Sequence, residues 1–217
     1  MQDQPPNIPT PPQDLQNKGK SKRKSVLTTI VTIVVIVFVT VGTRVIINTQ
    51  INKEKATPES LLKSEEITPY VSSEHGFTVD FPGFPSTEHS TLDIEGVSVP
   101  YTQYVKELNN GNTAYMVQVA KYPKSEIDIT GQERGSLDGA LNGMVQNIGA
   151  TIVSSSNNDT FINYPSAEAH LTYTEDGKTY DVYVRNFIKD NSLYTIATTG
   201  ESRSAFDTFA NSLTFQE

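Results

Sequence analysis

The chain of 217 residues contains no cysteine and no tryptophan. The absence of cysteine excludes disulfide bridges, thiolate metal ligands, cysteine nucleophiles and a lipid-modified cysteine next to an export signal. Any domain that this chain forms must therefore be stabilised by its packed core alone.

The sequence also lacks the short motifs that carry common enzyme chemistry. It has no Gly-x-Ser-x-Gly nucleophile elbow, no glycine-rich phosphate loop and no His-Glu-x-x-His zinc motif. Asp176-Gly177 lacks the alternating acidic spacing of a calcium loop and is better explained as a turn. We therefore expect no catalytic residue and no cofactor.

Basic residues are scarce in the C-terminal two thirds of the chain. Residues 69–217 hold eight Lys and Arg against nineteen Asp and Glu, a formal charge of −11, whereas residues 1–68 hold nine against six, a charge of +3. An acidic domain of this kind repels nucleic acid phosphates and anionic lipid. The charge distribution thus argues against a nucleic acid partner.

The longest apolar segment runs from Val26 to Ile47 and carries no charge before Arg44. As a helix it would measure about 33 Å, close to the hydrocarbon thickness of a bilayer. A cleaved signal peptide is the alternative, but the apolar core is too long and no small-x-small exit follows it. We expect an uncleaved signal anchor in the lipid bilayer over residues 25–48, represented by Val26, Ile30, Val34, Phe38 and Ile47.

A basic run stands directly before this segment. By the positive-inside rule it places the N-terminus in the cytoplasm and the C-terminal domain outside, so the chain is expected to be a single-pass protein of the cell membrane. The run can also attract anionic lipid headgroups. The topology-determining residues are Lys18, Lys20, Lys22, Arg23 and Lys24.

These features divide the chain into four parts. Residues 1–24 form a proline-rich cytoplasmic tail with a basic end, which we expect to be disordered, although a proline-binding module could recognise it. Residues 25–48 form the anchor, residues 49–69 a tether, and residues 70–217 one extracytoplasmic domain.

The outer part alternates between apolar and polar residues in most of its segments. This period predicts strands at 76–82, 97–108, 112–122, 150–155, 166–174, 179–188 and 192–198, and helical spacing predicts helices at 135–148 and 202–213. Asn109-Asn110-Gly111 and Glu175-Asp176-Gly177-Lys178 are hairpin turn signals. We predict an α+β fold, an antiparallel β-sheet flanked by helices as an α/β/α sandwich, preceded by a single transmembrane helix.

Four stretches of the outer part resemble the PsbP-like family. They are GFTVDFPGFP (76–85), GSLDGALNGMVQNIGATIVSS (135–155), YPSAEAHLTYTEDGKTYDVYVRNFIKDNSLYTI (164–196) and FDTFANSLTF (206–215). The resemblance covers about residues 70–217 and rests on packing motifs. It implies an α/β/α sandwich with a non-enzymatic binding or assembly role, and it carries over no metal or partner site.

Each histidine has a carboxylate nearby in the sequence, in Glu74-His75, Glu88-His89 and Glu168/His170. Neighbouring residues of a strand point to opposite faces, so the first two pairs cannot chelate a metal as they stand. Glu168 and His170 share a face, but two ligands on one strand make a weak site. We interpret all three histidines as surface residues and expect no metal site.

Three functional hypotheses remain. The first is a non-catalytic, membrane-anchored binding or scaffolding domain of the cell envelope, whose partner is an unknown envelope protein or small ligand. The second is a transmembrane sensor that passes the state of its ligand to the proline-rich tail. The third, and weakest, is a carboxylate-dependent hydrolase. Aromatic residues, with ten Tyr among them, are the better indication of binding, although most should lie in the core.

Overall fold

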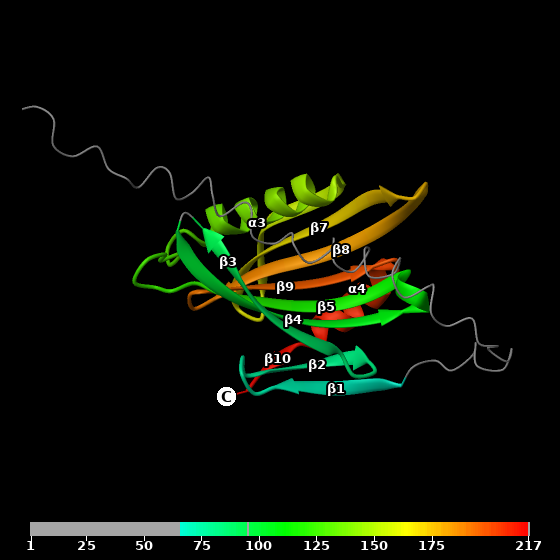
Figure 1. The fold of residues 1–217 in the computed structure, drawn as a ribbon, viewed down its shortest axis with the longest axis horizontal. Coiled ribbons are helices and arrows are strands. Elements are labelled where there is room, and N and C mark those ends of the chain that lie inside the picture. Colours follow the sequence, from blue (N-terminus) through cyan, green and yellow to red (C-terminus); the bar gives the residue numbers. More distant parts are fainter. Residues whose placement is uncertain (1–65, 95, 217) are drawn as a thin grey trace, which may run out of the picture.

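The computed structural model describes residues 66–94 and 96–216, and strands account for most of them (Figure 1). The elements are β1 (Ile67–Ser72), β2 (Phe77–Pro82), β3 (Ser86–Ile94), β4 (Val97–Leu108), the 3-10 turn η4 (Asn109–Gly111), β5 (Thr113–Lys121), α3 (Glu133–Ile148), β6 (Thr151–Phe161), β7 (Tyr164–Glu175), β8 (Lys178–Lys189), β9 (Ser192–Thr199), α4 (Arg203–Asn211) and β10 (Thr214–Phe215).

The strands form two antiparallel sheets. Seven of them make the large sheet, in the order β3-β4-β5-β9-β8-β7-β6, and the other three make a small sheet in the order β1-β2-β10. β5 pairs with β9 across a long stretch of sequence, so the two hairpin-connected halves of the large sheet join at its centre. β3 and β6 are the edge strands of the large sheet.

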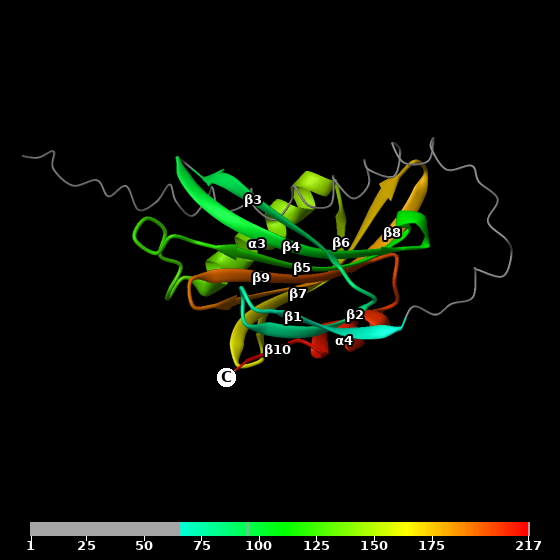
Figure 2. The ribbon, with the colours of Figure 1, turned by 60° about the horizontal axis from the view of Figure 1, so that its bottom comes forward.

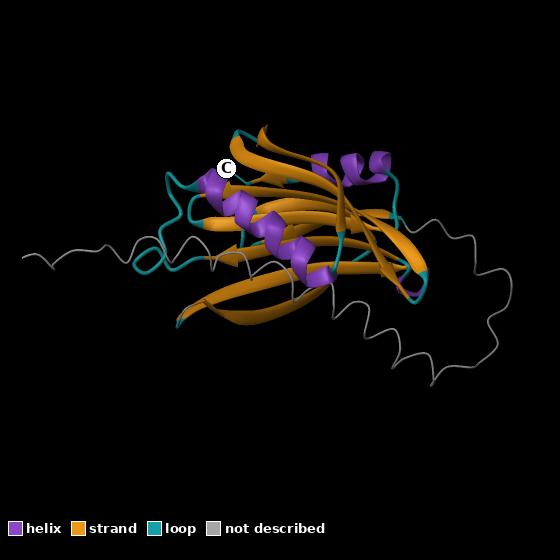
Figure 3. Ribbon diagram, turned by 90° about the horizontal axis from the view of Figure 1, so that it is seen from above, coloured by secondary structure: helices purple, strands orange, loops and turns teal. Residues whose placement is uncertain are grey.

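The predicted α/β/α sandwich is wrong. One face of the large sheet is covered by a single helix, α3, which crosses it obliquely (Figure 3). The opposite face is covered by α4 together with the small sheet (Figure 2). The described part of the chain is therefore a two-sheet, mainly β structure with two helices, and the segments 67–72, 86–94 and 214–215 form strands that the sequence patterns did not predict.

Each face of the large sheet has its own hydrophobic core. On the α3 side, Leu137 and Met144 of the helix pack with Leu171 and Val184 of the sheet, all of them buried. On the other side the core is aromatic, and its largest buried members include Phe77, Phe81, Phe187, Phe206 and Phe209. Burying each such ring is worth roughly 1.5–3 kcal/mol, so these aromatics hold the small sheet and α4 against the large sheet.

The predicted turns are confirmed. Asp176 and Gly177 both have positive φ, at 51° and 75°, as the tight turn between β7 and β8 requires. Asn109 and Asn110 also adopt positive φ at the β4–β5 connection. Gly149 ends α3 in the left-handed conformation, which a residue without Cβ adopts at little cost.

Among residues 66–94 and 96–216, no helix is long and apolar enough to cross a bilayer. The predicted anchor over residues 25–48, which the expected fold class included as a preceding helix, lies outside the described residues, as do the predicted cytoplasmic tail and most of the predicted tether.

Candidate functional site

Polar and charged side chains gather on one face of the β7–β8 hairpin, beside α4. The register pairs Glu168 with Arg185 and His170 with Tyr183, so these four residues lie on the same face of the sheet. Asp181, two residues before Tyr183, belongs to this face as well. The shared face predicted for Glu168 and His170 is therefore confirmed, but the two residues bind different partners.

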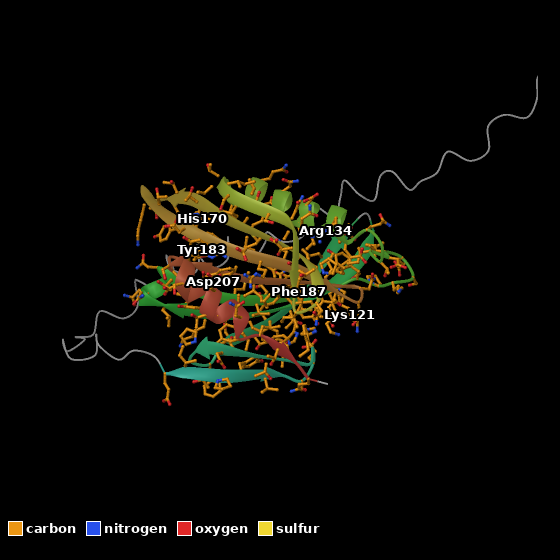
Figure 4. The ribbon with its side chains drawn as sticks, turned by 180° about the vertical axis from the view of Figure 1, so that it is seen from behind. Lys121, Arg134, His170, Tyr183, Phe187 and Asp207 are labelled. Atoms are coloured by element: carbon orange, nitrogen blue, oxygen red, sulfur yellow. The ribbon has the colours of Figure 1, made fainter. Side chains whose placement is uncertain are left out.

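His170 forms a dyad with Asp181. Its Nε2 lies 2.6 Å from Asp181 Oδ1, and its ring stacks on Tyr183 with the centroids 4.4 Å apart and the planes 16° apart. Figure 4 shows the His170 and Tyr183 side chains next to each other on this face. A carboxylate on one ring nitrogen fixes the orientation of the imidazole, and such a pair can accept a proton if a substrate is bound beside it.

Four further charged residues form what we call the α4 cluster: Glu168, Arg185, Arg203 and Asp207. The Glu168 carboxylate accepts from both arginines, with Oε2 2.5 Å from Arg185 Nη2 and Oε1 2.5 Å from Arg203 Nη2. Arg203 Nε lies 3.0 Å from both carboxylate oxygens of Asp207, one turn along α4. The pKa of Arg203 is raised, first by its hydrogen bond to Asp207.

Aromatic rings enclose the guanidinium groups of this cluster. Arg185 lies 4.6 Å from the ring centroid of Phe161 and 5.5 Å from that of Phe206, and Arg203 lies 5.7 Å from the latter. The side chains of Glu168 and Arg185 are only 17% and 13% exposed. Because each charge is matched by an opposite one, the α4 cluster is suited to hold α4 on β7 and β8.

The β6 strand pairs with β7 and forms one edge of the large sheet. Every residue from Thr151 to Thr160 is exposed, and Ile152 and Val153 expose 41% and 55% of their surface. No charged side chain occurs in β6 before Asp159. A long edge strand with no proline and no charge in its first eight residues is a surface that another molecule can cover.

Arg134 of α3 holds the C-terminal half of β6 by hydrogen bonds. Its guanidinium donates to the backbone carbonyls of Asn157, Asp159 and Ser166, the last at 2.9 Å. The β6–β7 register shifts between Ser156 and Asp159, so these carbonyls belong to an irregular stretch that the helix stabilises. A second shift lies between Ile152 and Ser154, and it makes Val153 an extra, outward residue.

The other two histidines meet at a single carboxylate. Glu74 Oε1 lies 3.7 Å from His75 Nε2, and Glu74 Oε2 lies 3.8 Å from His89 Nδ1. The sequence neighbour Glu88 is therefore not the carboxylate that pairs with His89. His75 is largely buried against Tyr104, and burial lowers its pKa below the ordinary 6.5. The interpretation of all three histidines as surface residues is therefore wrong for His75. Within residues 66–94 and 96–216, no group of three or more His, Asp and Glu is arranged to hold a metal ion.

The sequence-predicted anchor residues Val26, Ile30, Val34, Phe38 and Ile47 lie outside the described residues. So do the predicted topology-determining residues Lys18, Lys20, Lys22, Arg23 and Lys24. Sequence reasoning missed Asp181, Arg185 and Arg203 as partners of Glu168 and His170. The available signal was the alternation of charged residues in β8, where Asp181 and Arg185 fall on the same face.

No protein-family model matches the chain, and no curated protein matches its sequence. The solved structures that are similar to it include three at 10–13% identity, each over 70% of this chain. One is a Pseudomonas aeruginosa protein of unknown function, with 99% of its length matched and a TM-score of 0.34. Another is a Bacteroides thetaiotaomicron protein, with 49% of its length matched and a TM-score of 0.38.

The third is LpqN, which is involved in cell envelope biogenesis of Mycobacterium tuberculosis, with 91% of its length matched and a TM-score of 0.36. At these TM-scores the similarities assign neither a family nor a function. The resemblance to the PsbP-like family is accordingly not confirmed by any family match.

Proposed function

We propose that this chain is a membrane-anchored, extracytoplasmic binding domain of the cell envelope, that it is not an enzyme, and that its partner binds at the β6 edge. The observation that carries the binding surface is the exposure of β6, with Ile152 and Val153 on the outside and no charge before Asp159. Exposed apolar side chains on a sheet edge favour association with another chain.

The membrane anchor is supported by the sequence. Residues 26–47 are long and apolar enough to span a bilayer, and the basic run before them favours an N-terminus in the cytoplasm. The acidic C-terminal part would then face the outside of the cell. A PsbP-like assembly role is the finer form of this proposal, and it rests on the quoted sequence stretches alone.

The polar face of β7 and β8 supports a binding role over catalysis. The charges of the α4 cluster neutralise one another and attach α4 to the sheet. His170 has its carboxylate partner, but among the described residues no serine or threonine hydroxyl forms a hydrogen bond with it that would mark a nucleophile.

Photo-cross-linking of the full-length chain in its own membranes tests this proposal. A photoreactive residue at Val153 should capture an envelope protein, and one at Thr91, which is exposed on the opposite edge strand β3, should not. The capture at Val153 should fall when Ile152→Lys is added, because a buried lysine would be unpaired in the complex.

Equal capture from both positions, or capture that is insensitive to Ile152→Lys, would contradict a partner site at β6. Catalysis is tested separately by screening the full-length chain against hydrolase substrates. A turnover that disappears in His170→Gln while the fold is retained would refute the non-enzymatic part of the proposal.

A further inference from the structure

The outer face of the small sheet carries an apolar stripe along β1. Residues of this strand alternate, and Tyr70 points inward, where its ring contacts Phe81 and Tyr104. Ile67, Pro69 and Val71 therefore point outward, and Ile67 and Val71 expose 59% and 53% of their surface.

Phe84, two residues after the end of β2, is a further exposed apolar residue near the start of β1. It is the most exposed large hydrophobic residue described, at 75%. Gly83 N donates to the carbonyl of Glu66 at 3.1 Å, so the segment that carries Phe84 lies beside the start of β1. Ile67, Pro69, Val71 and Phe84 together are here called the β1 patch.

The β1 patch lies close in sequence to the predicted membrane anchor. The apolar segment ends at Ile47, and eighteen residues, 48–65, separate it from the first described residue, Glu66. Eighteen residues reach at most about 60–65 Å even when fully extended. An anchor at residues 26–47 would therefore keep the start of β1 within that distance of the bilayer. The small sheet and α3 lie at opposite sides of the molecule (Figure 1).

We propose that the β1 patch rests on the outer leaflet of the membrane as a second, weak contact beside the anchor. This inference depends on the membrane anchoring proposed above. Burial of the apolar side chains at the lipid interface removes them from water, and the tether keeps the patch at a high effective concentration near the lipid. The contact turns α3 away from the membrane and orients the domain for its partner.

The charges around the β1 patch determine which lipid it fits. Glu66 precedes β1, Glu74 lies in the turn that follows it, and Asp80 pairs with Pro69 across β1 and β2. These carboxylates are repelled by anionic headgroups, so the patch fits a zwitterionic surface. A basic protein partner would instead be attracted by the same carboxylates. Varying the charge of the lipid therefore distinguishes a lipid contact from a protein contact.

Because the chain has no cysteine, single-cysteine variants give clean labelling sites. The full-length chain is reconstituted at low density in phosphatidylcholine vesicles with an environment-sensitive fluorophore at Val71→Cys or Phe84→Cys. Ser155→Cys on the exposed β6 strand is the matched control, and Phe38→Cys reports on the anchor. We expect labels at positions 71, 84 and 38 to report an apolar environment and the label at 155 to report water.

The labels at 71 and 84 should return to water when half of the phosphatidylcholine is replaced by phosphatidylglycerol. They should also return to water when Ile67→Asp is added. Labels at 71 and 84 that are as wet as the label at 155, with position 38 buried, would overturn the lipid contact and leave the anchor intact. A wet label at 38 would instead refute the anchoring itself. Burial that rises with protein density would identify a second copy as the occupant and overturn the lipid contact.

Discussion

The Ser72 hydroxyl of β1 lies 2.8 Å from the phenolic oxygen of Tyr104 on β4, and this buried hydrogen bond joins the small sheet to the large one. Ser72 also accepts from the backbone N–H of His75 at 3.3 Å, so one hydroxyl organises both the turn after β1 and the contact between the sheets. Tyr104 is packed between Tyr70 and Phe77, which leaves its hydroxyl no access to bulk water.

Removing the phenolic oxygen in Tyr104→Phe should lower the free energy of unfolding by about 1–2 kcal/mol, because the buried Ser72 hydroxyl loses one of its two partners. A double-mutant cycle with Ser72→Ala, measured by urea denaturation, should give a coupling energy of about 1 kcal/mol. Additive effects of the two substitutions would show that the bond contributes nothing to the attachment of the small sheet.

Glu168→Gln should be among the most destabilising polar substitutions in the domain. Arg185 is largely buried, and the substitution leaves its guanidinium without the carboxylate that neutralises it. We expect a loss of about 2–4 kcal/mol in chemical denaturation. Asp207→Asn is the matched control, since Asp207 is more exposed and lies 3.9 Å from Arg185, and its effect should be clearly smaller. A loss for Asp207→Asn as large as that for Glu168→Gln would contradict this view of the α4 cluster.

Arg134→Lys should loosen the β6 edge without unfolding the domain. A lysine cannot donate in a fork to three carbonyls, so those of Asn157 and Asp159 lose their partners. Amide hydrogen exchange in residues 154–161 should become faster, while exchange in β9 should stay unchanged. Lys124→Ala, an exposed change in the loop before α3, serves as the control and should leave exchange in β6 as it is.

His75 should make the domain less stable in mild acid. Its pKa is lowered mainly by burial, so the unfolded chain takes up a proton near pH 6.5 while the folded chain stays neutral to lower pH. The unfolded state binds more protons in this range, and stability therefore falls as the pH drops below about 6.5. The neighbouring Glu74 opposes this effect, and Lys121 and His89 reinforce it.

The measurement is thermal unfolding between pH 7.5 and 5 for His75→Gln, compared with His89→Gln, whose side chain is exposed. The decline of the melting temperature with falling pH should be clearly flatter in His75→Gln than in the unmodified chain. In His89→Gln the change in slope should be smaller, because only a minor cause of the His75 shift is removed. A decline of unchanged slope in His75→Gln would mean that other groups cause the acid sensitivity.

The elements that sequence patterns predicted well are those with strong local signals. The bounds predicted for 97–108 match β4, and the helical period of 135–148 lies within α3. Turn chemistry located the β4–β5 and β7–β8 connections, because Asn and Gly adopt positive φ readily. In each case the interactions that decide the structure lie within a few residues.

The strands that were missed lack such signals. β3 is a polar edge strand with six exposed residues at its start, so its sequence shows no apolar face, and Pro69 interrupts the pattern of β1. β10 has only two residues. These segments become strands because of partners elsewhere in the chain, which a local pattern does not contain. β1 and β10 pair with the predicted strand β2 and so create the small sheet. The small sheet is the reason why the predicted layer of helices is wrong.

The composition of the molecule, its acidic C-terminal part, its local turns and the period of its longest elements can all be read from the sequence. The pairing of His170 with Asp181 and of Glu168 with two arginines is seen only in the folded chain. So are the contacts of Glu74 with two histidines and the exposed apolar side chains on β1, beside β2 and on β6. Strand register explains this difference. Which side chains meet across strands depends on how the strands pair, and a shift of one residue would turn each of them to the opposite face.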